Sequence, residues 1–272
     1  MKLTRLLLAF ALCCTARPAL AQLDPWEFDV YSVRTAGKGV LGLESLNSVV
    51  AKGPDAGYDG TASGTLPSGT IYRTAVEVTY GLTDKIEAAV YLNLALPEDG
   101  SFQYAGSKYR LRGSLFEHGQ LPVDVGWYLE LEWNETPRFD DQQLDLEFRP
   151  IFQKNVGRFS FIANPKFEKV LAGPGTDTAV EFGYATGVYY EALPVLSPGI
   201  EFYGAVGLMN DAEPRREQQH YLFTVLHGDL PGGLEYSFGP GFGLTPGSDD
   251  IIVKFNIELE SLLGTAPGKQ TS

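Results

Sequence analysis

The stretch VDVGWYLELEW, residues 123–133, alternates apolar and polar side chains without interruption. The apolar set is Val123, Val125, Trp127, Leu129, Leu131 and Trp133. The intervening set is Asp124, Gly126, Tyr128, Glu130 and Glu132. Successive side chains of a strand point to opposite sides of a sheet, so this period of two predicts a β-strand with one apolar and one polar face.

The same alternation recurs along the chain, while helix signals are nearly absent. About twelve segments show it, at roughly 38–52, 69–80, 85–97, 102–117, 122–134, 141–153, 157–171, 177–191, 197–210, 216–227, 231–242 and 249–261. These segments exceed the usual 5 to 6 residues of soluble sheets, and they are long enough to cross a bilayer at the tilt of barrel strands. The sequence therefore predicts an all-β fold, a transmembrane antiparallel up-and-down β-barrel of about 12 strands.

The connections between these segments alternate between tight and loose. Tight turns are predicted at residues 81–84 and 155–157. Looser polar links are predicted at residues 53–68, 134–140, 173–176 and 210–215. Because outer-membrane barrels have short periplasmic turns and longer external loops, the looser links are expected outside the cell.

The first 21 residues have the features of a cleaved secretory signal peptide. Lys2 and Arg5 precede an apolar run at residues 6–14, and the small residues Ala19 and Ala21 suit cleavage before Gln22. The two cysteines of the chain, Cys13 and Cys14, fall in that run, and neither follows the small residue typical of a lipid-modified cysteine. We expect an exported protein whose processed part has no disulfide and no cysteine metal site.

The expected organisation has four parts. Residues 1–21 are the signal peptide, residues 22–37 form an extra strand or a plug, residues 38–261 form the barrel, and residues 262–272 form a disordered tail.

Charge and hydropathy narrow the class of protein. The net charge is −13, and the processed chain would carry 18 basic against 34 acidic residues, which argues against nucleic acid as a partner. No later stretch approaches the roughly 20 apolar residues of a membrane-spanning helix.

Aromatic residues near strand ends could form the girdles of a membrane barrel, and the alternative is an exported soluble β-sandwich. These aromatic residues are Trp26, Tyr80, Trp127, Trp133, Tyr190 and Tyr221.

One hairpin resembles a known family. Residues 76–90, VEVTYGLTDKIEAAV, resemble the recurring hairpin of Gram-negative outer-membrane barrels and are similar to that of the transporter family named after meta-pathway phenol degradation. The resemblance implies a barrel in the cell outer membrane that admits small molecules, with outer-membrane lipid and the barrel assembly machinery as partners. The chain departs from such barrels at its end, because Leu259 and Glu260 are followed by residues 261–272 rather than by a terminal aromatic residue.

Charged residues on the polar faces are the candidate site. Folding about residues 119–120 pairs Lys108 with Glu132, Arg110 with Glu130 and Arg112 with Tyr128, and the next link is expected to place Asp145 opposite Glu130. The predicted pore-lining residues are Arg73, Glu77, Glu87, Lys108, Arg110, Arg112, Glu130, Glu132, Asp145, Glu147 and Arg149.

Two interpretations of this charge remain open. Segregated positive and negative walls would create a transverse field across an open pore, whereas a charge ladder would fill a closed lumen. Twelve strands lie between the filled barrels of eight strands and the open channels of sixteen. Glu77 and Glu87 are expected to face each other, with Arg73 compensating them.

Catalysis is not expected. The histidines are His118 and His227, predicted at short turns, and His220, near the outer end of its strand; none lies in a serine-nucleophile motif. No zinc spacing, phosphate loop or dinucleotide fingerprint is present, so no cofactor and no metal are expected.

The sequence favours a passive pore for small polar solutes. The alternatives are a closed structural or surface-binding barrel, and an outer-membrane lipid-modifying enzyme that uses His220.

Overall fold

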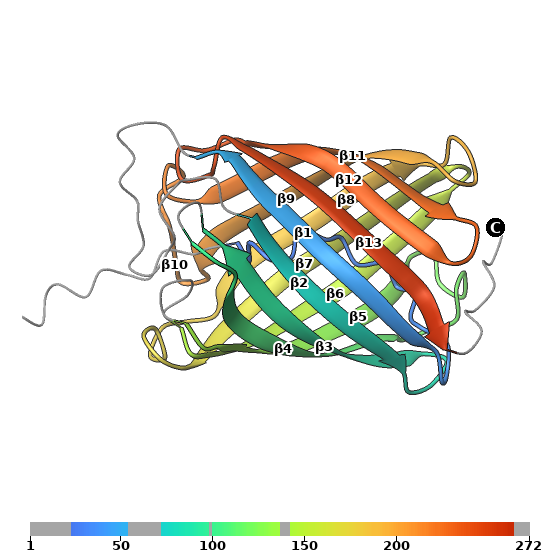
Figure 1. Ribbon diagram of the computed structural model, residues 1–272, viewed down its shortest axis with the longest axis horizontal. Helices are drawn as coiled ribbons and strands as arrows, with labels where there is room; N and C mark the ends of the chain where they lie inside the picture. The colour runs from blue at the N-terminus through green and yellow to red at the C-terminus, as the bar shows by residue number, and fades with distance from the viewer. Residues whose placement is uncertain (1–22, 54–71, 98–99, 137–141, 264–272) are drawn as a thin grey trace, which may run out of the picture.

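The computed structural model describes residues 23–53, 72–97, 100–136 and 142–263, and it shows a closed barrel of tilted strands (Figure 1). Twelve long strands make up the described part of the wall. They are β1 (Leu41–Lys52), β2 (Tyr72–Gly81), β3 (Ile86–Leu96), β4 (Gln103–Ser114), β5 (Asp124–Asn134), β6 (Leu144–Val156), β7 (Phe159–Ala172), β8 (Glu181–Tyr190), β9 (Ser197–Leu208), β11 (Gln219–Leu230), β12 (Leu234–Gly243) and β13 (Ile251–Leu263). A two-residue strand, β10 (Asp211–Ala212), pairs with the end of β9.

The sheet closes on itself. β1 pairs with both β2 and β13, β8 pairs with β9, and β9 pairs with β11, all antiparallel. Each long strand therefore has a neighbour on both sides, which satisfies the backbone groups that lipid cannot hydrogen-bond. The prediction of a barrel of about 12 antiparallel strands is confirmed, and the soluble sandwich is wrong.

The wall has its apolar face outside. Leu129, Trp133 and Phe148 are exposed, whereas Glu130 and Arg149 on the alternate positions are buried. A water-soluble barrel would have the opposite arrangement, so this orientation is that of a membrane barrel.

Among the residues that the structure describes, there is no helix with the length and apolar composition needed to cross a membrane.

The lipid-facing surface gives a first prediction. Leu129→Arg, at the centre of β5, should destabilise the inserted barrel by about 2–4 kcal/mol, because a guanidinium near the bilayer midplane loses its hydration. The folded fraction, followed by faster migration of unheated protein on a gel, measures this effect. Leu129→Phe is the matched control and should insert normally. Normal insertion of the arginine variant would mean that the wall is turned the other way.

Tight connections gather at one end of the barrel. β2 and β3 are joined by residues 82–85, and β6 and β7 by Gly157 and Arg158, where Gly157 has a φ of 58° that favours glycine. We call this the tight-turn end. Most of the predicted external loop 53–68 and the predicted signal peptide lie outside the described residues, and so does the expected tail beyond Leu263.

The orientation in the membrane can be tested by labelling. The opposite end of the barrel, which we call the loose end, carries the longer links. We expect a cysteine at Asp211, at this loose end, to react with an impermeant maleimide on intact cells. A cysteine at Thr83, an exposed turn residue, should react only after the outer membrane is permeabilised. The reverse labelling pattern would show that the barrel has the opposite orientation in the membrane. Unsubstituted protein is the control, because its two cysteines lie at positions 13 and 14.

Candidate functional site in the lumen

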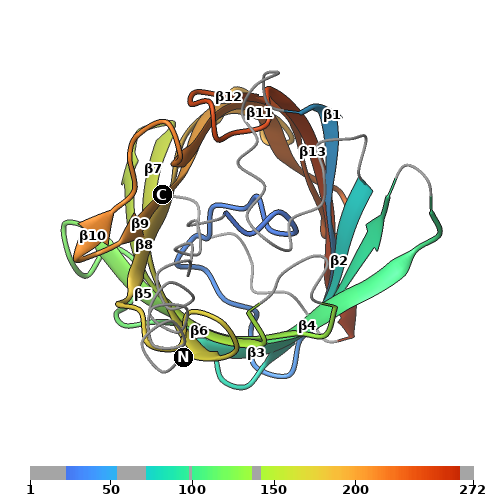
Figure 2. The same ribbon diagram turned by 90° about the vertical axis from the view of Figure 1, so that its left-hand side faces the viewer.

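The lumen holds a segment of the chain itself. Residues 23–39, which we call the interior segment, form no strand and lie inside the barrel wall (Figure 2). At the loose end, the indole Nε1 of Trp26 donates to the carbonyl of Leu94 at 2.9 Å. At the tight-turn end, the backbone N–H of Ala36 donates to Oε2 of Glu87 at 2.6 Å.

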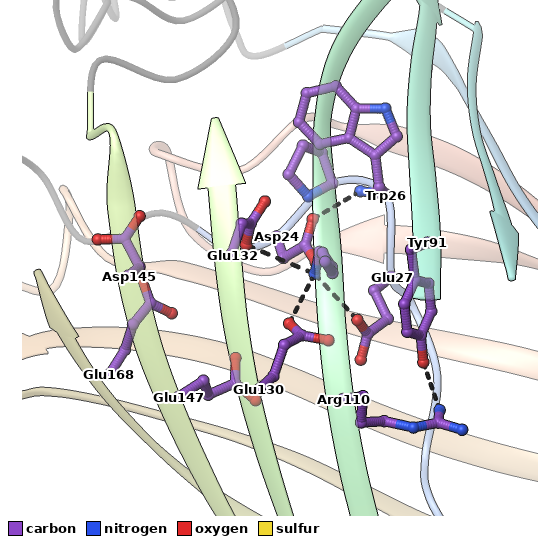
Figure 3. Close-up of polar contacts among 12 residues, drawn as sticks. Asp24, Trp26, Glu27, Tyr91, Arg110, Glu130, Glu132, Asp145, Glu147 and Glu168 are labelled. Carbon is purple, nitrogen blue, oxygen red and sulfur yellow. Dashed lines mark hydrogen bonds and ion pairs between the residues drawn. The ribbon is translucent and has the colours of Figure 1, made fainter. Parts of the chain in front are cut away.

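Lys108 of β4 is the centre of an ion cluster that ties this segment to the wall. Its Nζ lies 3.0 Å from Oε2 of Glu27 and 3.0 Å from Oε1 of Glu130, and it also bonds Asp24 (Figure 3). Glu132 is 3.5 Å away. Only 1% of the Lys108 side chain is exposed, so water screens these attractions weakly.

A second cation, Arg149 of β6, holds the other side of Glu27. Its Nη2 lies 2.8 Å from Oε1 of Glu27. Burial alone would raise the pKa of Glu27, but Arg149 and then Lys108 hold that pKa well below its ordinary value. Glu27 is therefore an anion inside the barrel, and the wall compensates its charge.

Three arginines surround Tyr31, which lies further along the interior segment. The guanidinium carbons of Arg110, Arg112 and Arg149 lie 5.2, 5.0 and 5.4 Å from the centre of the Tyr31 ring. Attraction between a cation and a ring face contributes roughly 0.5–2 kcal/mol per contact, depending on desolvation. The backbone N–H of Tyr31 also donates to Oδ1 of Asn164 at 2.8 Å, which orients the segment at this level.

Apolar packing holds the segment on the opposite wall. Phe28 packs against Tyr203, Tyr221 and Phe223, with ring centres 5.1 to 5.7 Å apart. Below this cluster, Nζ of Lys254 donates to the carbonyl of Phe28 at 2.9 Å.

Lys254 also belongs to a buried polar group. Its Nζ pairs with Oε2 of Glu201 at 2.5 Å, and none of the Lys254 surface is exposed. The candidate residues chosen from the sequence do not include Asp24, Glu27, Glu201 or Lys254. Acidic residues interleaved with Trp26 and Phe28 were the available signal for the first two.

The predicted pore-lining residues all lie in the described wall, but their pairing differs from the predictions in part. Across β4 and β5, Lys108 faces Glu132, Arg110 faces Glu130 and Arg112 faces Tyr128, as predicted. Across β5 and β6 the prediction is wrong by two residues. Glu130 faces Glu147, Glu132 faces Asp145 and Tyr128 faces Arg149. The error arises because the length of the β5–β6 connection sets this register and the alternation does not.

The expected facing of Glu77 and Glu87 is also wrong. Glu77 faces Tyr91, and Glu87 faces Gly81. Arg110 joins the two carboxylates instead, with its Nη2 at 2.6 Å from Glu77 and 2.7 Å from Glu87.

Arg73 does not compensate these carboxylates. Its guanidinium lies over the Trp26 ring, 5.8 Å from the ring centre.

Of the two interpretations left open, the lumen agrees with a charge ladder rather than with separate positive and negative walls. Glu147 of β6 pairs with Arg149 on its own strand and, at 2.6 Å, with Lys166 of β7. Lys108 lies among carboxylates of β5 and of the interior segment. Opposite charges therefore alternate around the lumen and neutralise one another locally.

A large cavity opens at the tight-turn end, below the level of Tyr31. Its volume is about 590 Å³, and its lining includes Asp29, Glu44, Glu201 and Glu258. A second cavity lies deeper in the lumen, between the interior segment and strands β6 to β9. Its volume is only about 20 Å³, which is room for about one water molecule. Within the described part of the chain, the lumen is thus wide at one end and filled in its middle.

Asp29 of the interior segment lines the large cavity at its inner end. Burial is the largest cause that raises the pKa of Asp29, the carboxylates of Glu201 and Glu27 raise it too, and Lys254 and Arg112 oppose the shift. The resulting pKa is about 6. Asp29 is thus poised to change charge near neutral pH.

The wall of this cavity carries a row of glutamates on four neighbouring strands. Glu77 faces Glu44, Glu44 faces Glu258, and Glu258 faces Glu235, which spans β2, β1, β13 and β12. Arg110 pairs with the first and Arg34 with the last. Among the described residues, Glu44 and Glu258 form no salt bridge.

The three histidines lie in different environments. Nδ1 of His118 is 2.7 Å from Asp124 in the β4–β5 connection. The ring of His220 contacts the Tyr184 hydroxyl at 3.1 Å and Gln218 at 2.8 Å.

Ser248, the serine in contact with His220, bonds its backbone N–H and carbonyl rather than its ring. His227 lies within β11 and not at the predicted short turn, because β11 continues to Leu230 and the turn follows at residues 231–233.

No protein-family model matches this chain, and no curated protein matches it. Its fold is similar to that of an outer-membrane channel from Pseudomonas putida F1, with a TM-score of 0.59 and 10% identity over 86% of this chain and 99% of that one. It also matches the translocator domain of the autotransporter NalP from Neisseria meningitidis, with a TM-score of 0.42 and 7% identity over 82% and 88% of the two chains. LpxR from Salmonella typhimurium has a TM-score of 0.39 and 10% identity over 80% and 99%. The fold is that of an outer-membrane β-barrel, which is consistent with the predicted location in the cell outer membrane.

Proposed function

We propose that this protein is an outer-membrane channel for small polar solutes and that the interior segment is its gate. The observation that carries the proposal is how the lumen is filled. The interior segment is anchored largely by ion pairs and hydrogen bonds, and a 590 Å³ cavity reaches it from one end.

Stability alone does not explain a charged filling. Replacing a buried ion pair with packed apolar side chains is often neutral or stabilising, so a purely structural barrel has little use for the cluster around Lys108. Polar contacts, in contrast, can be exchanged for water when a segment moves. A charged filling therefore suits a gate better than a permanent core.

Two further observations agree with a channel. The barrel shares its fold with the outer-membrane channel of Pseudomonas putida F1. The hairpin at residues 76–90 resembles that of the meta-pathway transporter family, whose members are inferred to admit small molecules.

The lining favours cations over anions. Glu44 and Glu258 lie on the cavity wall without a salt bridge to a described residue, and Asp29 and Glu201 lie above them. The carboxylates of the cavity lining outnumber its basic side chains, and where they are ionised their net negative charge raises the local concentration of cations. Salt weakens this effect as the Debye length falls below about 10 Å.

The test is single-channel recording of the refolded protein in a planar bilayer, with the reversal potential measured across a salt gradient. We expect discrete openings from a mainly closed baseline and a preference for cations that is greatest at low salt. At alkaline pH, where both carboxyl groups are ionised, replacing Glu44 and Glu258 together by glutamine should move the reversal potential toward zero. Glu135→Gln, an exposed carboxylate at the loose end, is the control and should leave it unchanged.

The recordings separate the proposal from its alternative. A closed structural or surface-binding barrel gives no openings at any voltage. If the double variant shows openings with an unchanged reversal potential, the protein is a channel, but Glu44 and Glu258 do not set its ion preference.

A further inference from the structure

Three side chains of metal-binding type meet at the tight-turn end of the lumen. They are His227 and Asp229 of β11 and Glu235 of β12, and one ligand atom from each lies within 4.8 Å of the others. All three belong to the lining of the large cavity. None of them was among the candidate site residues chosen from the sequence.

The β11–β12 hairpin explains how they come together. His227 and Asp229 are two residues apart in one strand, so they project to the same side of the sheet. The register places Asp229 directly opposite Glu235. The turn between them contains Gly232 and Gly233, with φ of 96° and 77°, values that favour glycine.

The state of His227 makes it available as a ligand. Within the described residues, neither of its ring nitrogens forms a hydrogen bond, whereas both nitrogens of His220 do. The ring of Tyr189 packs beside His227, with ring centres 5.9 Å apart, and limits its rotation. An imidazole that is held in place and borders an open cavity can bind a metal ion with little reorganisation.

The donor set selects a class of ion. One imidazole with two carboxylates suits zinc and similar divalent transition ions, whereas calcium and magnesium prefer oxygen ligands alone. Bonds of about 2.0–2.1 Å in a tetrahedral zinc site place ligand atoms roughly 3.3 Å apart, so a small rotation of the three side chains closes the site. The cavity leaves the fourth position open to water or to a solute.

We propose that His227, Asp229 and Glu235 bind a divalent transition-metal ion of the zinc type at the tight-turn mouth of the lumen. The site also contacts the interior segment. Arg34 pairs with Glu235 and, at 2.5 Å, with Glu260. A bound ion competes with Arg34 for the Glu235 carboxylate, and it therefore loosens one attachment of the segment to the wall.

This spacing differs from the usual zinc motifs, which explains why no metal was expected from the sequence. Two ligands come from alternate positions of one strand, and the third comes from the facing strand across a three-residue turn. Only the pairing of β11 with β12 brings the third ligand to the first two.

The experiment is titration of refolded, untagged protein that begins at Gln22 with Zn²⁺ in a calorimeter, because this chain lacks the thiols of Cys13 and Cys14. We expect one ion per chain, bound with micromolar affinity. His227→Ala and Asp229→Asn should each weaken binding about tenfold or more, since even outer-shell partners of metal ligands contribute about 10- to 100-fold. Arg34→Ala should strengthen binding, because it removes the competing cation.

His220→Ala is the matched control. It removes an imidazole from the same strand at the opposite end of the barrel, and Zn²⁺ binding should not change. Co²⁺ gives a second readout, since the visible absorption of the bound ion should disappear in His227→Ala and persist in His220→Ala.

Faster gel migration of unheated protein confirms that each variant is folded. The proposal is overturned if folded wild-type protein binds no Zn²⁺, if binding survives both His227→Ala and Asp229→Asn, or if Ca²⁺ binds more tightly than Zn²⁺. The titration involves no conductance, so its outcome is independent of the proposed channel function.

Discussion

Deletion of residues 23–36 is expected to turn a mainly closed barrel into a permanently open one, with single-channel conductance several-fold above that of the intact protein. The reason is steric and electrostatic. These residues fill the lumen at the level of Lys108 and Arg110, and their removal leaves charged side chains that water can solvate. The wall should persist, because its long strands pair with each other and not with the deleted segment.

A milder variant serves as the control for this deletion. Asp24→Asn with Glu27→Gln keeps the length of the segment but removes its two anionic contacts to Lys108. We expect openings of intermediate frequency at unchanged full conductance. If the deletion variant folds and conducts no better than the intact chain, the interior segment is not the gate.

Neutralising Lys108 should produce the largest loss of stability from a single substitution. In Lys108→Met, the carboxylates of Asp24, Glu27 and Glu130 lose a shared, buried cation. Removing one partner of a buried ion pair costs about 3–5 kcal/mol, because the remaining charge is left without compensation. The midpoint of urea unfolding in detergent or lipid measures the loss, and protease sensitivity of the interior segment should rise in parallel.

A matched substitution separates burial from charge. Lys52 pairs with Asp250 in the open, with 62% of its side chain exposed, so Lys52→Met should cost about 1 kcal/mol or less. Adding Glu27→Gln to Lys108→Met should restore part of the loss, because it removes one uncompensated carboxylate. Equal stability of the two lysine variants would show that water screens the Lys108 cluster as it screens the surface.

The lumen wall shows how far sequence reasoning reaches. The pairing of Lys108 with Glu132 and of Arg110 with Glu130 follows from folding one hairpin about its centre, and it is confirmed. The next pairing is wrong by two residues, although every side chain stays on the predicted face. Alternation distinguishes odd from even positions, but a shift of two residues leaves it unchanged.

The contacts of Lys108 mark the limit of that reasoning. Its position on the polar face of a strand is readable from the sequence, but two of its carboxylate partners come from the interior segment, more than 80 residues earlier. The alternation of Trp26, Phe28 and Val30 with Glu27 and Asp29 suits an extra strand as well as a plug, so it does not place residues 23–39. Only the closed barrel creates the enclosed polar space that such a segment can occupy.

The amino-acid sequence by itself determined the strands and the fold class, because a period of two is local and its repetition over 10 to 14 residues leaves few other folds. The tertiary structure decided what the lumen contains and which charges meet there. Closure of the wall between β1 and β13 set the row from Glu77 to Glu235, and the enclosed interior segment gave Glu27 two cations. The register of β11 with β12 brought Glu235 to His227 and Asp229. These contacts depend on register and on enclosure, and both are properties of the assembled sheet rather than of any strand within it.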